Sequence, residues 1–226
     1  MALIVATLTG ACAERATLPP NPTVAAPHAY SICPQSGELP PTDVNDEAVS
    51  VLRERLSLLG VAEPDVTIGS CIELALELTG QDPDTVQAAV LGTGRVELVP
   101  VPPEQVGAIQ AGSLGPVGVQ PIVASSDLTG AAIAADEAGH PVLTLTMTPA
   151  GADALGAWTA GHVGGSVALV VDGVVAAVPV INGPTPGGSV QVSFGATPPV
   201  ALEALRVMVL SGPLPEAWAQ PERPQG

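Results

Sequence analysis

One long apolar stretch limits what this chain of 226 residues can fold into. Residues 166–188 read SVALVVDGVVAAVPVINGPTPGG, and Asp172, Gly173 and Pro179 interrupt the apolar side chains. A membrane-spanning helix there would bury an unpaired Asp, at a cost of ~2.5–3.5 kcal/mol. Asp-Gly between two apolar runs is instead the strongest short signal for a β-hairpin. We therefore predict two strands that meet at a tight turn formed by Asp172 and Gly173, with Pro179 at an edge or bulge.

The charge balance excludes several classes of function. The formal net charge is −16, and the sequence contains no Lys. A nucleic-acid binder needs basic side chains to neutralise phosphates, and attraction to an anionic membrane surface needs them too. Aromatic residues make up only 2% of the chain, so small aliphatic side chains must build the core, and 25 Gly and 25 Pro favour strands and turns over a helical bundle. We expect no nucleic-acid partner.

The N-terminus resembles a bacterial lipoprotein signal. An apolar run, Ala2 to Leu8, precedes Thr9-Gly10-Ala11-Cys12, and in such signals the Cys after small residues is lipidated and becomes the new N-terminus. No basic residue precedes the run and Leu8 lies one place early, so an ordinary N-terminus is the alternative. We predict a signal at residues 1–12, lipidation of Cys12 and an Ala- and Pro-rich tether at residues 13–29.

Residues 30–101 alternate strands and helices. The expected strands are 30–33, 65–68, 71–78 and 94–101. An amphipathic helix that Asn45 or Asp46 can cap precedes the second strand, and a helix that begins at Asp82-Pro83 precedes the fourth. The order strand, helix, strand, strand, helix, strand predicts a ferredoxin-like βαββαβ module in an α+β protein.

Two cysteines remain after Cys12, namely Cys33 and Cys71. An even pair outside the cytoplasm predicts a disulfide, with two buried free thiols as the alternative. In a ferredoxin-like fold the first and third strands run parallel, which places these two residues at opposite ends. Either Cys33 lies in a loop that curls back, or the first strand is wrongly assigned. No Cys and His residues have zinc spacing, and we predict neither a metal nor a cofactor.

The second half of the chain predicts another α+β module. Residues 102–125 are rich in Pro and Gly and lack periodicity, so we predict a connector. Residues 126–215 alternate apolar and polar side chains in VLTLTMT and SVQVSF, which predicts antiparallel hairpins. Thr148-Pro149 and Thr197-Pro198 each predict the start of a helix. Residues 216–226 predict a disordered tail.

This second module resembles the head of the first periplasmic domain of the SecD family. The specific residues are the Val-Asp-Gly turn, the small apolar run through Pro179, Ile181-Asn182 and Gly187-Gly188. The earlier segment VLRERLSLLGVAEPDV resembles the family's base, just after its first membrane helix. The resemblance covers about Val49 to Pro215. The chain departs from the family at three positions where basic residues are usual, namely Gly165, Ser166 and Val174.

The resemblance implies a role in protein export, because SecD works with SecF beside the Sec translocon. No segment after Cys12 offers an uninterrupted apolar run of spanning length. We therefore expect a solitary extracytoplasmic lipoprotein without the family's membrane helices, held at the membrane of the cell envelope by its lipid. Its expected partners are polypeptides or envelope proteins, Sec translocon components among them. The alternative is an envelope scaffold or adaptor unrelated to translocation.

No residue pattern predicts an enzyme. The motifs GxSxG and GK[ST] are absent, and His140 and His162 lie in a predicted turn and near a predicted helix end. We predict no catalytic residues. If a groove binds apolar peptide, the candidates are Met147, Trp158 and Phe194, although their inward positions make core packing the commoner role.

Overall fold

The structure, a computed structural model, describes residues 28–62, 64–194 and 201–218. These residues form three three-stranded sheets, with strand orders β1-β3-β2, β4-β7-β8 and β5-β6-β9. In chain order the elements are β1 (His28–Ile32), α1 (Thr42–Leu58), β2 (Asp65–Ile68), β3 (Ile72–Leu76), α2 (Pro83–Leu91), β4 (Val96–Val101), β5 (Leu128–Ala135), β6 (Pro141–Met147), α3 (Pro149–Gly161), β7 (Ser166–Val171), β8 (Val174–Ala177), β9 (Ser189–Ser193) and α4 (Leu202–Ser211).

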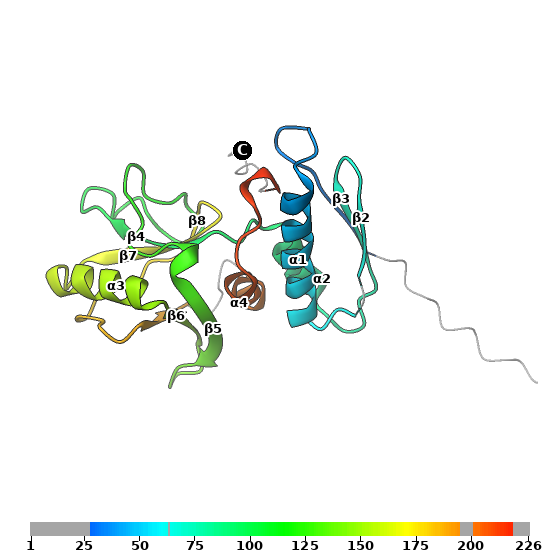
Figure 1. Cartoon of the computed structure of the whole chain (residues 1–226). Helices are drawn as coiled ribbons and strands as arrows, with labels where there is room; N and C mark the ends of the chain where they lie inside the picture. The colour runs from blue at the N-terminus through cyan, green and yellow to red at the C-terminus, as the bar shows by residue number, and fades with distance from the viewer. Residues whose placement is uncertain (1–27, 63, 195–200, 219–226) are drawn as a thin grey trace, which may run out of the picture.

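The N-terminal unit, residues 28–91, is one sheet with two helices on one face (Figure 1). β3 lies between β1 and β2 and runs antiparallel to both. Ile72, Leu74 and Leu76 are buried on the same side of β3, because side chains alternate between the two faces of a strand. They pack with the apolar faces of α1 and α2 in one core.

The ferredoxin-like arrangement predicted for residues 30–101 is not what forms. β1 runs antiparallel to β3, and β4 pairs with β7 in another sheet. The strand β4 is apolar on both faces, since Leu98 packs in the larger core and Val99 and Val101 in a smaller one. A strand of that kind needs cover on both faces. In the β4-β7-β8 sheet the larger core covers one face and residues that include Ile109 and Val119 cover the other, whereas the sheet of the N-terminal unit has helices on one face only.

The two-sheet unit, residues 96–193, packs its two sheets against a shared core. Its β7–β8 hairpin confirms the turn predicted from Asp172-Gly173. Both residues have positive φ, 48° and 80° respectively, as a two-residue type I′ turn requires. The apolar run of β7 is explained by burial on both faces of its sheet.

Residues 102–125 do more than connect two modules. Leu114 forms a β-bridge with Val174, and Val123 forms one with Leu98, so the segment borders the β4-β7-β8 sheet on both sides. Ile109 and Val119 of this segment pack on the outer face of that sheet. The boundaries predicted at residues 101 and 125 therefore divide a single folded unit.

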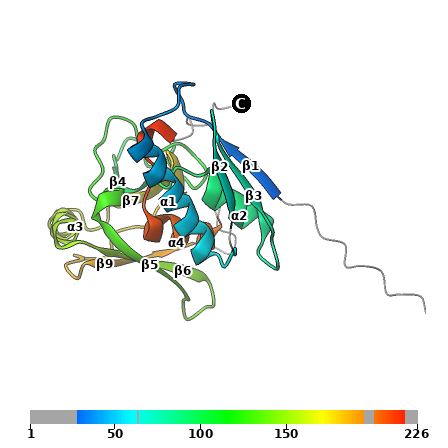
Figure 2. The ribbon, with the colours of Figure 1, turned by 45° about the vertical axis from the view of Figure 1, so that its right-hand side comes forward.

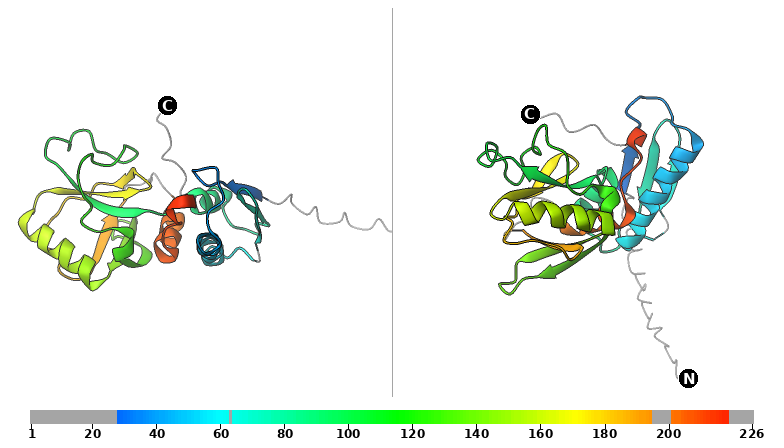
Figure 3. Two further views of the ribbon diagram at one scale, coloured as in Figure 1. Left: turned by 45° about the horizontal axis from the view of Figure 1, so that its top comes forward. Right: turned by 60° about the vertical axis from the view of Figure 1, so that its left-hand side comes forward.

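The C-terminal residues return to the N-terminal unit. α4 lies between the two units (Figures 1 and 3) and contributes to the larger core. Beyond it, Leu214 and Trp218 are buried in the core of the N-terminal unit, and the indole N–H of Trp218 donates to Oδ1 of Asn45 (3.1 Å). The disordered tail predicted from residue 216 is therefore wrong for residues 216–218, and residues 219–226 lie outside the described residues.

The predicted helix starts have mixed outcomes. Asp82 and Thr148 cap α2 and α3, because their side chains accept from backbone N–H groups three residues later. α1 begins at Thr42, and Asn45 does not cap it but donates to the carbonyl of Pro40 (2.9 Å). Thr197 lies outside the described residues, in which α4 begins at Leu202. β1 begins at His28, inside the segment predicted as a tether.

A buried arginine joins α1 to the ends of α2 and α4. Arg55 of α1 is fully buried, and its guanidinium donates to the carbonyls of Ala89 (2.8 Å) and Gly92 (2.6 Å) at the end of α2. It also donates to the carbonyls of Thr93 (2.8 Å) and Gly212 (2.9 Å), the second of which follows α4. Burial lowers the pKa of Arg55 to about 10, against the opposing effect of a nearby carboxylate, so the side chain stays charged at neutral pH. The carbonyl ends of two helices suit that charge.

Candidate functional site

The candidate site is a groove of about 550 Å³ in the two-sheet unit, between β9 and residues 179–185. We call it the β9 groove. Its floor contains four buried apolar side chains, from β4, α3, β7 and β9: Leu98, Leu155, Val167 and Val192. None of the residues that line the groove carries a charge. An uncharged concave surface with an apolar floor and a polar rim is typical of a binding site.

A buried threonine holds one wall of the β9 groove in place. The backbone N–H of Thr185 donates to Oγ1 of Thr159 (3.0 Å), and that hydroxyl donates to the carbonyl of Leu155 in α3 (2.8 Å). Thr159 is fully buried. A Cβ at Gly156 would make an ordinary van der Waals contact with Cα of Pro186, at 3.5 Å, so the wall lies close to α3. The wall is thus fixed on a helix rather than left as an open loop.

The rim of the β9 groove is apolar on one side and polar on the other. Val180 lines the groove and is 55% exposed. Ser189 and Gln191, on the opposite rim, are also exposed. The rim can therefore contact apolar side chains on one side and hydrogen-bonding groups on the other.

The three side chains predicted as peptide-binding candidates do not line this groove. Met147 and Phe194 are 7% and 3% exposed and belong to the larger core. Trp158 packs against that core, and its ring stacks on His162 with 4.2 Å between the ring centroids. Nδ1 of His162 donates to the carbonyl of Trp158 (2.7 Å), which caps the end of α3. These three residues therefore contribute to the larger core and not to the lining of the groove.

The hairpin turn lies at the junction of β4 and β7. Oδ1 of Asp172 accepts from the backbone N–H of Arg95, and its own N–H donates to the carbonyl of Arg95, each at 2.9 Å. The turn therefore fixes the start of β4 against the hairpin. Asp172 has a structural role here, as the turn geometry predicts.

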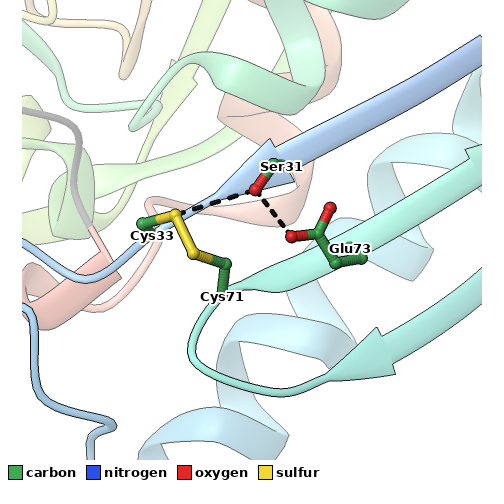
Figure 4. The surroundings of a disulfide bond; sticks show 4 residues. All are labelled: Ser31, Cys33, Cys71 and Glu73. Atoms are coloured by element: carbon green, nitrogen blue, oxygen red, sulfur yellow. Dashed lines mark hydrogen bonds between the residues drawn. A yellow bond between two sulfur atoms is a disulfide. The ribbon is translucent and has the colours of Figure 1, made fainter.

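Cys33 and Cys71 form a disulfide (Figure 4). Because β1 and β3 are antiparallel, the end of β1 lies beside the start of β3, where Ile32 pairs with Ile72. This resolves the conflict between the disulfide and a parallel pair of strands. Oγ of Ser31 donates to Oε1 of Glu73 (2.8 Å) next to the bond. Cys12 lies outside the described residues.

Catalytic and metal chemistry find little support in the described part of the chain. Within it, no cluster of three or more His, Cys, Asp or Glu side chains is placed to hold a metal ion. His140 lies in the β5–β6 turn, and its Nδ1 lies 3.3 Å from Oδ2 of Asp136. A second cavity, of about 280 Å³, lies between α1, α2 and the start of α4, with Asp82 and Glu203 in its lining. Asp82 caps α2, and Glu203 pairs with Arg206, so both have structural partners.

The sequence contains one signal for the β9 groove that lies outside its motifs. No charged residue occurs between Asp172 and Glu203, in a protein in which 12% of residues are charged. Both rims and one floor residue of the groove come from this run. The Pro and Gly residues of this uncharged run indicate turns. Local periodicity does not predict that β9 pairs with β6.

Comparison with known proteins identifies relatives. Residues 106–216 match the family model described as SecDF, P1 head subdomain. SecD of Acidaminococcus fermentans, a protein translocase subunit, is 27% identical over 186 residues, which is 80% of this chain and 40% of the relative. SecDF of Thermus thermophilus is 30% identical over 205 residues, which is 79% of this chain and 27% of the relative. The chain thus spans less than half the length of these relatives.

Solved structures share the fold. A chain from a study of SecDF, described as a membrane component that enhances protein export, has a TM-score of 0.64 at 24% identity and covers 85% of this chain and 97% of its own length. SecDF in a super-membrane-facing form has a TM-score of 0.65 at 22% identity, over 88% of this chain and 31% of that one. In the described residues, no helix combines the length and apolar character needed to cross a membrane. These matches identify the chain as a relative of the first periplasmic domain of SecD and SecDF, and residues 106–216 match the model of its head subdomain.

Proposed function

We propose that this chain binds polypeptide segments outside the cytoplasm, in the β9 groove, and serves protein export without catalysing a covalent reaction. The observation that carries the proposal is the uncharged groove with an apolar floor and the exposed Val180 on its rim. Unfolded polypeptides expose apolar side chains and unpaired backbone groups, and the groove offers partners to both. The names of the relatives, protein translocase subunits, support the same setting.

The location of the protein is part of the proposal. A disulfide between Cys33 and Cys71 is typical of an oxidising compartment outside the cytoplasm. Lipidation at Cys12 would hold the protein at the membrane of the cell envelope. Replacing Cys12 with Ala should release the protein from the membrane fraction, and unchanged retention would remove the lipid anchor from the proposal.

Binding can be tested with a labelled, permanently unfolded polypeptide, followed by fluorescence anisotropy. Val180→Asp places a charge on the groove rim and should weaken binding about tenfold or more. Val117→Asp is the matched control, because Val117 is 78% exposed on the segment that covers the other sheet. It should bind as the unmodified protein does. Absence of binding to the unmodified protein, or equal loss in both variants, would refute the proposal.

Crosslinking in cells tests the biological setting. We expect crosslinks from residue 180 to exported polypeptides or to Sec translocon subunits. Recovery of envelope proteins alone, with secretion normal in a deletion strain, would favour a scaffold or adaptor role in the envelope.

A further inference from the structure

The outer edge of β9 carries unpaired backbone groups. β6 and β9 are joined at one end by the N–H of Met147, which donates to the carbonyl of Gly188 (2.9 Å), and at the other by the N–H of Phe194, which donates to the carbonyl of Pro141 (3.2 Å). Bonded and non-bonded residue pairs alternate in an antiparallel ladder. Counted from either end, the N–H and C=O groups of Ser189, Gln191 and Ser193 point away from β6.

This edge is accessible in the described structure. Ser189, Gln191 and Ser193 are exposed, and none of the described residues hydrogen-bonds to their outward backbone groups. Charged side chains and prolines, which commonly block an open edge, are absent from β9. Both edges of the β4-β7-β8 sheet are bordered instead, by the bridges from Val123 and Leu114.

A second backbone edge faces the β9 groove from the other rim. The N–H of Val167 donates to the carbonyl of Pro179 (3.1 Å), and the N–H of Ile181 donates to the carbonyl of Gly165 (2.8 Å). Val180, between these two bonds, therefore turns its N–H and C=O away from β7. The groove is bordered by hydrogen-bonding groups on both sides.

We infer that an extended polypeptide binds by adding a strand to the outer edge of β9, which deepens the proposed function and rests on it. The outward groups repeat every second residue, about 6.5–7 Å apart, and only an extended chain matches that spacing along its length. Backbone bonds give affinity that tolerates many sequences. The uncharged lining selects uncharged residues at the centre of the segment, and the net charge of −16 favours basic residues at its flanks.

Amide hydrogen exchange followed by NMR reports on this edge directly. The probe is a short peptide of alternating valine and serine residues with an arginine at each end. In the free protein, the amides of Val190 and Val192 should be protected by β6, and those of Ser189, Gln191 and Ser193 should exchange fast. Saturating peptide should slow the second group about tenfold or more. Bound peptide with unchanged exchange at these three amides would overturn strand addition.

A proline variant provides an independent test. Gln191→Pro removes an outward N–H without removing a bond to β6, and an edge strand tolerates proline at such a position. Peptide affinity should fall about tenfold or more. Ile68→Pro is the matched control, since β2 is an edge strand whose register and the bond from Gly69 to Cys71 turn the N–H of Ile68 outward. It should leave affinity unchanged, and circular dichroism should show both variants folded.

The outcomes separate the two proposals. Loss of binding in Val180→Asp with full affinity in Gln191→Pro would retain a peptide-binding groove and overturn strand addition. Failure of the unmodified protein to bind the peptide would overturn both. Protection of Ser189 and Gln191 that grows with protein concentration in the absence of peptide, together with a dimer in sedimentation, would assign the edge to a second copy of this chain and overturn the inference.

Discussion

The guanidinium of Arg55 donates a 2.9 Å hydrogen bond to the carbonyl of Gly212, 157 positions later in the chain. The same side chain reaches Ala89 and Gly92 at the end of α2. One residue thus satisfies carbonyls at the ends of two helices, which otherwise have no partner within their helices. This contact ties the end of α4, the last described α-helix, to α1.

Replacing Arg55 with Met should lower the free energy of unfolding by about 3 kcal/mol or more, because several buried carbonyls lose their donor. Arg55→Lys should recover only part of the loss, since one ammonium cannot match the planar guanidinium. Denaturant titration measures both. Arg53→Met, an exposed position on the same helix, is the control and should change stability little. Equal losses at residues 53 and 55 would contradict the structural role of Arg55.

Removing the disulfide should destabilise the N-terminal unit. Cys33 and Cys71 are 38 positions apart, and a crosslink over that loop contributes about 3–4 kcal/mol in the chain-entropy model. Denaturant titration of the double variant Cys33→Ser/Cys71→Ser should therefore show a lower midpoint. Reductant should shift the unmodified protein to the same midpoint and leave the variant unaffected. Reaction of both Cys33 and Cys71 with a thiol reagent in the untreated folded protein would show that the bond is absent.

Replacing Asp172 with Asn and replacing it with Ala should have different effects on stability. Asp172→Asn keeps an oxygen acceptor for the N–H of Arg95 and tolerates the positive φ of 48°. Asp172→Ala loses the acceptor and the short polar side chain that lets Asp and Asn occupy the left-handed region, so we expect a loss of about 2 kcal/mol in thermal or denaturant unfolding. Asp153→Ala, at an exposed position on α3, serves as control. Indistinguishable Asn and Ala variants would argue against this account of the turn.

The β5–β6 turn should weaken in acid. Oδ1 of Asp136 accepts from the backbone N–H groups of His140 (2.8 Å) and Ala138 (2.9 Å). The bond from the backbone of His140 is the main cause that lowers the pKa of Asp136 below its ordinary value. A depressed pKa in the folded state means that the contribution is present above the unfolded-state pKa of about 4 and is lost as pH falls through the lower folded-state value. The amide shifts of both residues, followed by NMR, should titrate there.

Asp136→Asn is the control for this titration. Its amide oxygen still accepts the two hydrogen bonds but does not titrate in this range. The acid transition of the His140 amide should therefore vanish in this variant. A transition that persists unchanged would assign it to another group.

Local signals in the sequence predicted most of the secondary structure. Asp82 and Thr148 start helices because their side chains accept from the first turn, and Asp172-Gly173 makes a hairpin because both residues adopt positive φ. These features depend on neighbours in the chain, so periodicity and turn chemistry are sufficient to find them. β5 was missed, because its run of Ala and Gly has little strand preference of its own and forms through pairing with β6.

The same local signals cannot predict which strands pair when they lie far apart in the sequence. The direction of β1 and the partner of β4 depend on contacts between distant segments, and a strand pattern is the same whichever neighbour it finds. The β9 groove depends on such contacts too, since its walls come from residues 179–185, α3 and β9. The uncharged run between Asp172 and Glu203 is the local feature of the sequence that indicates the β9 groove.

The position of Trp218 affects when the N-terminal unit can complete its folding during synthesis. Ile32 and Trp218 belong to the same buried cluster, so the first unit to be synthesised is completed by the last described residues. Since synthesis proceeds from the N-terminus, the core that α1, α2 and β3 share lacks Leu214 and Trp218 until these residues have emerged. We therefore expect the N-terminal unit to reach its full stability only after residues 214–218 have been synthesised.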